Sequence, residues 1–257
     1  MNERYIGVFD SGFGGLTLVK ALEEALPEES IVFLADNAHM PYGTKSQEEI
    51  ISYSHANADF LARYDLKALV IACNTSDSIA GPILKAECPF PVFGVIAPAA
   101  RKALQMSTNK RIGIIATPLT AKTMVYDKTI KGLDENARVF SVGCPGLADL
   151  VEDGSFINDK ERVKAVLSGH LSFLADKDID TLILGCTHYD VLAEMAGELT
   201  GKNIVSSSRC VIEDIASGIP LAGKGHQPER LYFCSGDSAG FEKTARLLMD
   251  DIRIEKK

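Results

Sequence analysis

The chain alternates short runs of β-forming apolar residues with longer segments in which apolar residues recur every three or four positions. The short runs predict buried strands at residues 5–9, 31–35, 66–72, 91–96, 111–116 and 181–184. Between the first two runs, the spacing of apolar residues from Leu16 to Leu26 places one apolar stripe on a helix. This alternation predicts an α/β fold with mainly parallel sheet, whose ligands bind beyond the carboxyl ends of the strands.

Two further segments have the signals of helices. Ser46 and Glu49 have the spacing of a capping box, which predicts a helix that runs to about Tyr64. The segment from Asp159 to Leu174 carries several charged residues in its first turns, which is typical of a helix with a solvated face. We assign no function to that second helix.

The composition narrows the class of protein. A chain of 257 residues that is 46% apolar can form one large α/β domain or two small ones. Its net charge of -8 gives no electrostatic support for binding nucleic acid or anionic lipid, so we expect a small-molecule partner. Because the sequence has neither a signal segment nor an apolar stretch near the ~18 residues of a membrane span, we expect a cytoplasmic protein without a membrane partner.

Cysteine supplies the strongest chemical signal in the sequence. Six cysteines occur without Cys-x-x-Cys spacing, so in a reducing compartment we expect free thiols, and a single free thiol is usually a small buried hydrophobe. Residues 66–75, however, have a near echo at residues 179–188, and each of these predicted strands ends in a small residue followed by cysteine. The repeat singles out Cys73 and Cys186 and indicates that one βα unit was used twice.

Two matched thiols favour a symmetric reaction. A thiol at a strand end that faces a helix N-terminus has a lowered pKa, so we expect thiolate to be accessible near neutral pH. Racemisation requires a base on one face of a carbon and an acid on the other, and two equivalent thiols can fill both roles in either direction. Two alternatives remain: a thiol hydrolase with His188 as its base, and a zinc site that includes Cys186 and His188.

The loops after the other predicted strands are less specific. Residues 10–15 combine Asp10 with glycines that allow a ligand close to the backbone, but the pattern is that of neither a dinucleotide nor a Walker loop. Asp10 itself suits a helix cap, a metal ligand or a proton-handling carboxylate. Residues 38–46 contain a Pro-x-Gly turn with one aromatic residue, which suits a plain connection or a rigid wall against a ligand.

The ordered set of these motifs resembles the glutamate racemases of the aspartate/glutamate racemase superfamily. The resemblance rests on AspSerGlyPheGlyGly, ProTyrGlyThrLys, AlaCysAsnThr, GlyValIle and LeuGlyCysThrHisTyr, in this order and spacing along nearly the whole chain. It implies two flavodoxin-like domains that face each other across a central cleft. The expected domains are residues 1–96 with 209–257, on the side of Cys73, and residues 97–208, on the side of Cys186.

The resemblance also implies roles for individual residues. Cys73 would take the proton from D-glutamate with the assistance of Asp10, and Cys186 would take it from L-glutamate with the assistance of Glu152 and His188. The residues implied to bind the substrate are Asp10, with Ser11, Pro41, Tyr42 and Gly43 at the side-chain carboxylate and Asn74, Thr75, Thr117, Thr120 and Thr187 at the α-carboxylate. No cofactor and no metal is expected, and the product D-glutamate would serve peptidoglycan synthesis.

Some positions depart from the family pattern. Asp77 follows Cys73 by one helical turn and would repel an anionic substrate, so we expect it to point away from the cleft. Asp190 stands where many members have proline. These departures leave open a related racemase for a substrate such as aspartate, or a regulatory binding protein on the same fold; a homodimer is a further alternative for the assembly.

Overall fold

The fold consists of two parallel sheets surrounded by helices. A computed structural model describes residues 4–257. Its strands are β1 (Tyr5–Asp10), β2 (Ile31–Ala35), β3 (Leu66–Ile71), β4 (Val92–Gly94), β5 (Arg111–Ala116), β6 (Arg138–Gly143), β7 (Thr181–Gly185), β8 (Asn203–Ser206), β9 (Arg230–Cys234) and β10 (Glu255–Lys256). Its helices are α1 (Gly15–Ala25), α2 (Gln47–Leu61), α3 (Asn74–Ile79), α4 (Gly81–Glu87), α5 (Ile96–Met106), α6 (Pro118–Thr123), α7 (Val125–Leu133), α8 (Leu147–Glu152), α9 (Ser155–Asn158), α10 (Lys160–Leu171), α11 (Ala193–Thr200), α12 (Ser207–Gly218) and α13 (Ser238–Ala245), with 3-10 turns η1 (Tyr42–Thr44), η2 (Ser172–Leu174) and η3 (Thr187–Leu192).

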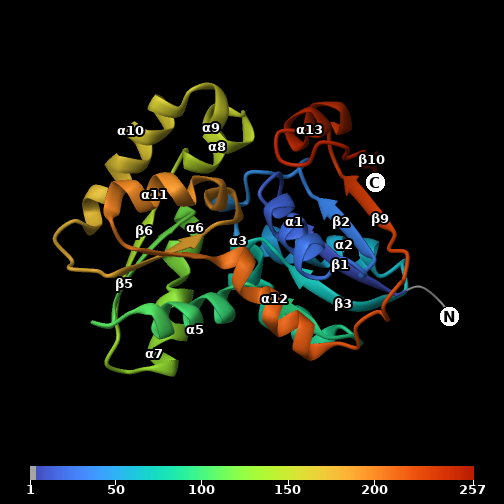
Figure 1. The fold of residues 1–257 in the computed structure, drawn as a ribbon, viewed down its shortest axis with the longest axis horizontal. Coiled ribbons are helices and arrows are strands. Elements are labelled where there is room, and N and C mark those ends of the chain that lie inside the picture. The colour runs from blue at the N-terminus through green and yellow to red at the C-terminus, as the bar shows by residue number, and fades with distance from the viewer. Residues whose placement is uncertain (1–3) are drawn as a thin grey trace.

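Each sheet organises one half of the molecule. The six-stranded sheet has the order β10-β9-β2-β1-β3-β4, and the four-stranded sheet has the order β6-β5-β7-β8. We call the parts around them the first half and the second half. The last segment of the chain returns to the first half, where β9 pairs with β2 and β10 pairs with β9. Figure 1 shows this return as the red strand beside the blue strands β1 and β2.

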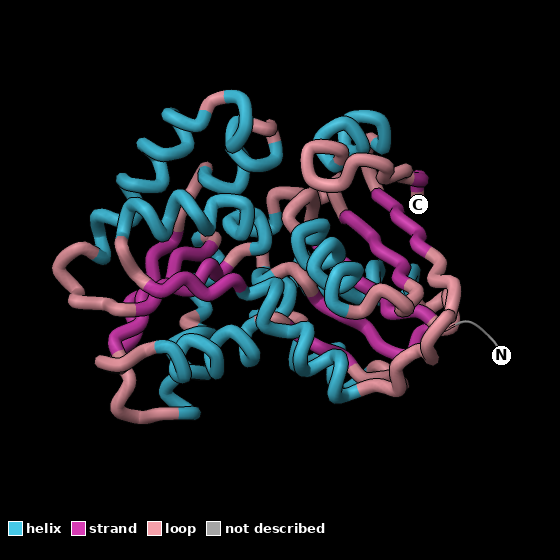
Figure 2. Tube along the Cα trace, in the orientation of Figure 1, coloured by secondary structure: helices cyan, strands magenta, loops and turns pink. Residues whose placement is uncertain are grey.

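Successive strand residues in the first sheet alternate between two apolar layers. Val8 and Phe33 face the layer that contains α1 and α12, whereas Phe9 and Leu34 face the layer of α2 and α4. The first of these layers is continuous with the core of the second half. Both halves therefore have helices on the two faces of a parallel sheet, which Figure 2 shows as magenta strands between cyan helices.

Most of the predicted elements are confirmed. Every predicted strand forms, although the run at 91–96 is a strand only over Val92–Gly94 because Ile96 already begins α5. Ser46 accepts a hydrogen bond from the backbone of Glu49 while the Glu49 side chain accepts one from the backbone of Ser46, so the predicted capping box begins α2. The helix expected from 159 is α10, which passes into η2. Strands β6, β8, β9 and β10 were not predicted from the sequence.

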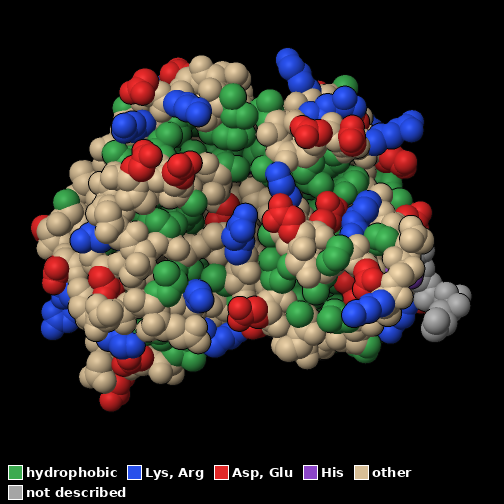
Figure 3. Space-filling view, in the orientation of Figure 1, with side chains coloured by type: hydrophobic (Ala, Val, Ile, Leu, Met, Phe, Trp, Pro, Cys, Tyr) green, Lys and Arg blue, Asp and Glu red, His purple; other side chains and the backbone are tan. Residues whose placement is uncertain are grey.

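The surface carries side chains of both charges. Figure 3 shows acidic and basic side chains interspersed over both halves on the face that it draws. Across residues 4–257, no helix is both long enough and apolar enough to cross a bilayer.

Candidate active site

Strand register brings the candidate residues together. Phe9 of β1 pairs with Ile71 of β3, and the Ala72 amide donates to the Phe9 carbonyl at 3.0 Å, so Asp10 and Cys73 leave neighbouring strands at the same edge of the first sheet. In the second sheet Ala116 pairs with Gly185, which places Thr117 beside Cys186. Both edges are carboxyl ends of parallel strands, where ligands are expected to bind.

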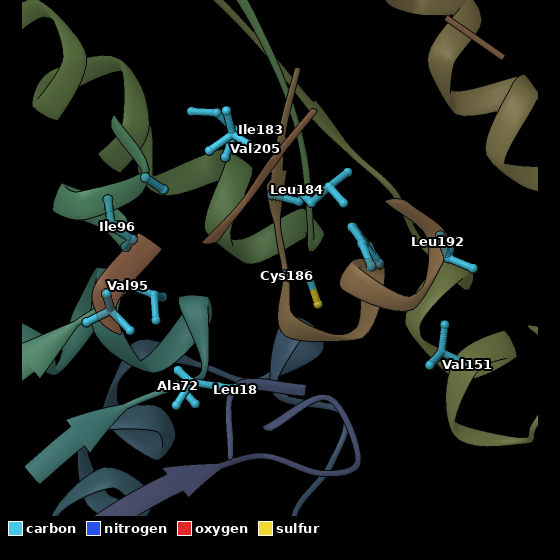
Figure 4. Close-up of a cluster of buried hydrophobic side chains, with 14 of the residues drawn as sticks. Leu18, Ala72, Val95, Ile96, Val151, Ile183, Leu184, Cys186, Leu192 and Val205 are labelled. Carbon is cyan, nitrogen blue, oxygen red and sulfur yellow. The ribbon is translucent and has the colours of Figure 1, made fainter. Parts of the chain in front are cut away.

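The two edges enclose one cavity of about 100 Å³. This volume is well below the roughly 300–1,000 Å³ of pockets for drug-sized ligands, so in this conformation the cavity suits a small molecule and not a nucleotide. Cys73 from the first half and Cys186 from the second half both line it. Figure 4 shows the Cys186 sulfur pointing out of the apolar cluster below Leu184 and toward the loops of the first half.

Most of the predicted site residues line this cavity. They are Ser11, Pro41, Tyr42, Gly43, Cys73, Asn74, Thr75, Thr117, Glu152, Cys186, Thr187 and His188. Asp10 and Thr120 are buried immediately behind its wall. Asp10 accepts hydrogen bonds from the Gly12 amide at 3.0 Å and the Thr187 hydroxyl at 3.1 Å, and Thr120 lies 3.0 Å from Thr75 through their hydroxyl oxygens.

Cys73 occupies a buried, acidic corner of the cavity. Its thiol donates to the Ser11 hydroxyl at 3.8 Å, and only 5% of the residue is exposed. Burial, with the nearby charge of Asp10 as the next cause, raises the pKa of Cys73 to about 11. The prediction of a lowered thiol pKa is therefore wrong for Cys73, because the short helix α3 does not outweigh desolvation. Cys73 holds its proton at neutral pH, as an acid catalyst must.

Cys186 has a different environment. Its sulfur lies 3.7 Å from Nδ1 of His188, and Nε2 of His188 lies 2.6 Å from Oε1 of Glu152. Burial opposes a charge on His188, but the hydrogen bonds and charges of Cys186 and Glu152 outweigh it and raise the pKa of His188 well above its ordinary value. A protonated imidazole beside the sulfur can stabilise negative charge that develops there.

Glycines of the first loop allow the two halves to approach closely. A Cβ at Gly12 would lie 2.1 Å from a carboxylate oxygen of Glu152, and one at Gly14 would lie 2.4 Å from the Thr187 hydroxyl. The amide of Phe13 donates to Glu152 at 2.7 Å. The glycines were predicted to admit a ligand to the backbone; in this structure they instead admit polar groups of the second half, which fixes Glu152 for its contact with His188.

Hydroxyl and amide groups from both halves meet on another wall. The hydroxyl oxygens of Thr75, Thr117 and Thr120 lie 2.9 to 3.0 Å from one another. The side-chain amide of Asn74 donates to Ser207 and its carbonyl accepts from Tyr126. These hydrogen bonds hold the groups in fixed positions, so they form an ordered polar wall of the cavity.

Several lining residues were missed by sequence reasoning. They include Met40, Thr44, Pro118, Cys144, Pro145, Gly146, Ala148, Asp149 and Tyr189. Cys144 follows β6, whose apolar residues were not recognised as a strand, and the Pro-Gly pair after it was the only available turn signal. Tyr189 belongs to a quoted motif but received no role; its hydroxyl donates to the Cys144 carbonyl at 3.2 Å.

Asp77 and Asp190, the acidic departures from the family pattern, both lie outside the cavity lining. Asp77 accepts a hydrogen bond from the Ile96 amide at 2.9 Å at the start of α5, so the prediction that it points away from the cleft is confirmed. Asp190 lies between α1 and the second half, where Thr17 donates to its Oδ2 at 3.4 Å. Its Oδ1 is buried and has no hydrogen-bond partner among the described residues.

Replacing Asp190 by asparagine is expected to stabilise the fold at high pH only. Burial raises the pKa of Asp190 to about 6, so the folded state holds this proton more tightly than the unfolded chain does. Stability is therefore lost as pH rises from about 4 to about 6, and the loss persists above that window. In urea titrations Asp190→Asn should gain on the order of 1–3 kcal/mol at about pH 8 and little at about pH 4.

Asp65→Asn provides the matched control for this titration, since the Asp65 side chain is half exposed and pairs with Arg4 on the surface. An equal gain for Asp190→Asn at both pH values would show that the carboxyl is not the titrating group.

A metal site has no support in the side-chain arrangement. Within residues 4–257, no group of three or more histidine, cysteine, aspartate and glutamate side chains is placed to hold a metal ion. His188, the one histidine weighed as a zinc ligand, has its second ring nitrogen on Glu152.

Comparison with known proteins finds relatives over the whole chain. The profile of the Asp/Glu/hydantoin racemase family matches residues 6–215. A glutamate racemase of Sulfurihydrogenibium sp. is 40% identical over 256 residues, which cover 98% of this chain and 96% of that one. The crystal structure of a glutamate racemase isoform from Bacillus anthracis has a TM-score of 0.94 at 34% identity, covering 100% of this chain and 97% of that one. That of a glutamate racemase from Francisella tularensis in complex with D-glutamate has a TM-score of 0.90 at 32% identity, with the same coverage.

Proposed function

Since this chain belongs to the Asp/Glu/hydantoin racemase family, we propose that it interconverts L-glutamate and D-glutamate with two thiols and no cofactor. One observation carries the proposal: the matched thiols Cys73 and Cys186, which follow strands of two different sheets, are both buried and line a single cavity of small-molecule size. The Francisella relative, which binds D-glutamate, supports glutamate as the substrate.

In the proposed reaction from L to D, Cys186 acts as the base and Cys73 as the acid. The Cys186 sulfur takes the α-proton, the electron pair of the Cα–H bond passes into the α-carboxylate, and the Cys73 thiol gives its proton to the opposite face of the carbon. The reverse direction exchanges the two roles. The raised pKa of Cys73 supports its role as the proton donor in this direction.

Three further side chains are proposed to assist the thiols. His188, held by Glu152, stabilises negative charge on Cys186 and accepts or returns its proton. Asp10 is proposed to assist Cys73; burial raises the pKa of Asp10 above its ordinary value, which favours its taking part in proton handling beside the thiol.

Binding is proposed to use the two polar walls of the cavity. The α-carboxylate, which becomes a dianion in the intermediate, would lie at the wall of Asn74, Thr75, Thr117 and Thr187, with Thr120 bracing it from behind. The Thr187 hydroxyl already donates to Asp10, so this proton is directed away from the cavity. The side-chain carboxylate would lie at Ser11 and the Pro41–Gly43 segment.

The proposal has consequences for organisation and location. We propose that residues 1–96 with 209–257 and residues 97–208 act as two domains, which the division into two sheets supports. Thiols that must stay reduced suit the cytoplasm, where D-glutamate would serve peptidoglycan synthesis.

Activity is tested with purified protein and each glutamate enantiomer in the presence of a chelator and without added pyridoxal phosphate. We expect optical rotation to decay to zero from either side. Aspartate forms the comparison arm, and faster loss of its rotation would reassign the substrate. A stable rotation with both amino acids would leave a regulatory binding protein as the better interpretation.

A further inference from the structure

Asp36 is a buried carboxylate that lies close to the cavity but does not line it. Asp36 directly follows β2 and is only 2% exposed. Its amide donates to the Asp10 carbonyl at 2.8 Å, so its backbone is fixed beside the first candidate loop. Burying a carboxylate is costly unless hydrogen bonds compensate, so the partners of Asp36 indicate what it does.

Asp36 joins three segments of the first half. Its Oδ2 accepts from the Tyr42 hydroxyl at 2.5 Å, and its Oδ1 accepts from the Ser235 hydroxyl at 2.6 Å. Both oxygens lie 2.9 Å from Nδ1 of His39. The carboxylate thus connects the segment that carries Pro41–Gly43 to the loop after β9. Bonds to an ionised acceptor are stronger than neutral ones, so this is a firm anchor.

Tyr42 is the member of this network that reaches the cavity. Besides donating to Asp36, its hydroxyl accepts from the Asn57 side-chain amide at 3.2 Å, and the residue is only 2% exposed. The hydroxyl proton is committed to Asp36 and is not available to a substrate. The ring and backbone of Tyr42 therefore form the cavity wall, while its hydroxyl acts as the anchor of that wall.

We propose that Asp36 is a positioning residue for substrate binding, which acts through the Tyr42 hydroxyl to hold the Pro41–Gly43 segment in its binding geometry. This inference rests on the proposed function, in which that segment receives the side-chain carboxylate of glutamate. A segment that is ordered beforehand loses little entropy when the substrate binds. Because the proton transfers occur at the other end of the substrate, Asp36 affects KM more than kcat.

The test compares Asp36→Asn, Tyr42→Phe and the double variant in steady-state racemisation of L-glutamate and D-glutamate. We expect each single variant to raise KM by about ten-fold with kcat close to that of the unaltered protein. If Asp36 acts through the Tyr42 hydroxyl, the double variant is no worse than Asp36→Asn alone. Tyr42→Phe keeps the ring and the carboxylate, so it carries the test if Asp36→Asn does not fold.

Asp180→Asn is the matched control, because Asp180 is another carboxylate that accepts several hydrogen bonds, from Ser107, Thr108 and Asn109, but outside the cavity lining. It should lower the unfolding temperature without changing KM. The inference would be overturned if the fold-increase in KM of the double variant equalled the product of the two single increases. It would also be overturned if Tyr42→Phe left KM unchanged. Failure of the unaltered protein to racemise glutamate would instead overturn the proposed function.

Discussion

Replacing Cys73 or Cys186 by serine is expected to lower racemisation in both directions by about 10² to 10⁴-fold. A serine hydroxyl is a much weaker acid than a thiol, so it can neither hold a negative charge as a base nor deliver a proton at a useful rate. Both residues are almost completely buried, and serine is nearly isosteric with cysteine, so folding should be preserved. The loss is measured by polarimetry with each enantiomer.

Exchange of the α-proton in deuterated water separates the two variants. Cys73→Ser retains Cys186 and should exchange only L-glutamate, while Cys186→Ser retains Cys73 and should exchange only D-glutamate. Cys88→Ser, at a half-buried thiol outside the cavity lining, is the control and should keep full activity. Full racemisation by either site variant would contradict the assignment of both thiols.

Replacing His188 by asparagine is expected to lower kcat/KM by about 10²-fold. The variant loses the positive charge 3.7 Å from the Cys186 sulfur and leaves Glu152 without its imidazole partner. The loss of kcat/KM must be equal in both directions, because two enantiomers in water have the same free energy and the equilibrium constant stays at one. The side on which His188 acts therefore has to be identified from isotope effects.

Substrates deuterated at the α-carbon give that identification. Slower proton transfer at Cys186 should raise the isotope effect on kcat/KM for L-glutamate, whose deuteron Cys186 removes. The effect for D-glutamate should fall toward one, because its deuteron is removed at Cys73. His55→Asn, at a partly exposed contact with Glu87, should change neither value. The opposite pattern would place His188 on the side of Cys73.

Residues at strand ends were predictable from the sequence because two local signals coincide there. Cys73 and Cys186 each follow an apolar run and a small residue, and parallel strands bring such positions to one edge. Thr117, which was assigned through the family resemblance, likewise follows a strand, β5. Strands whose residues are only half-buried were missed: β6 and β8 have weak apolar signals because they are the edges of the second sheet.

Properties that depend on contacts between distant segments could not be predicted. The raised pKa of Cys73 comes from burial and from Asp10. The sequence indicated only the helix that follows the cysteine, whose N-terminus would lower this pKa. Gly12 and Gly14 leave room for Glu152 and Thr187, respectively, which lie more than a hundred residues away in the chain. Asp36 belongs to no motif that was recognised in the sequence, and its partner Ser235 comes beside it only because β9 pairs with β2.

The most direct test of two thiols acting on opposite faces of one carbon is the early distribution of deuterium during racemisation of L-glutamate in deuterated water. Proton removal by Cys186 and delivery by Cys73 place solvent deuterium in the D-glutamate formed, while the remaining L-glutamate keeps its original proton. Deuterium that appears equally in both enantiomers from the first turnovers would show a single base that serves both faces, and would contradict the two-thiol mechanism.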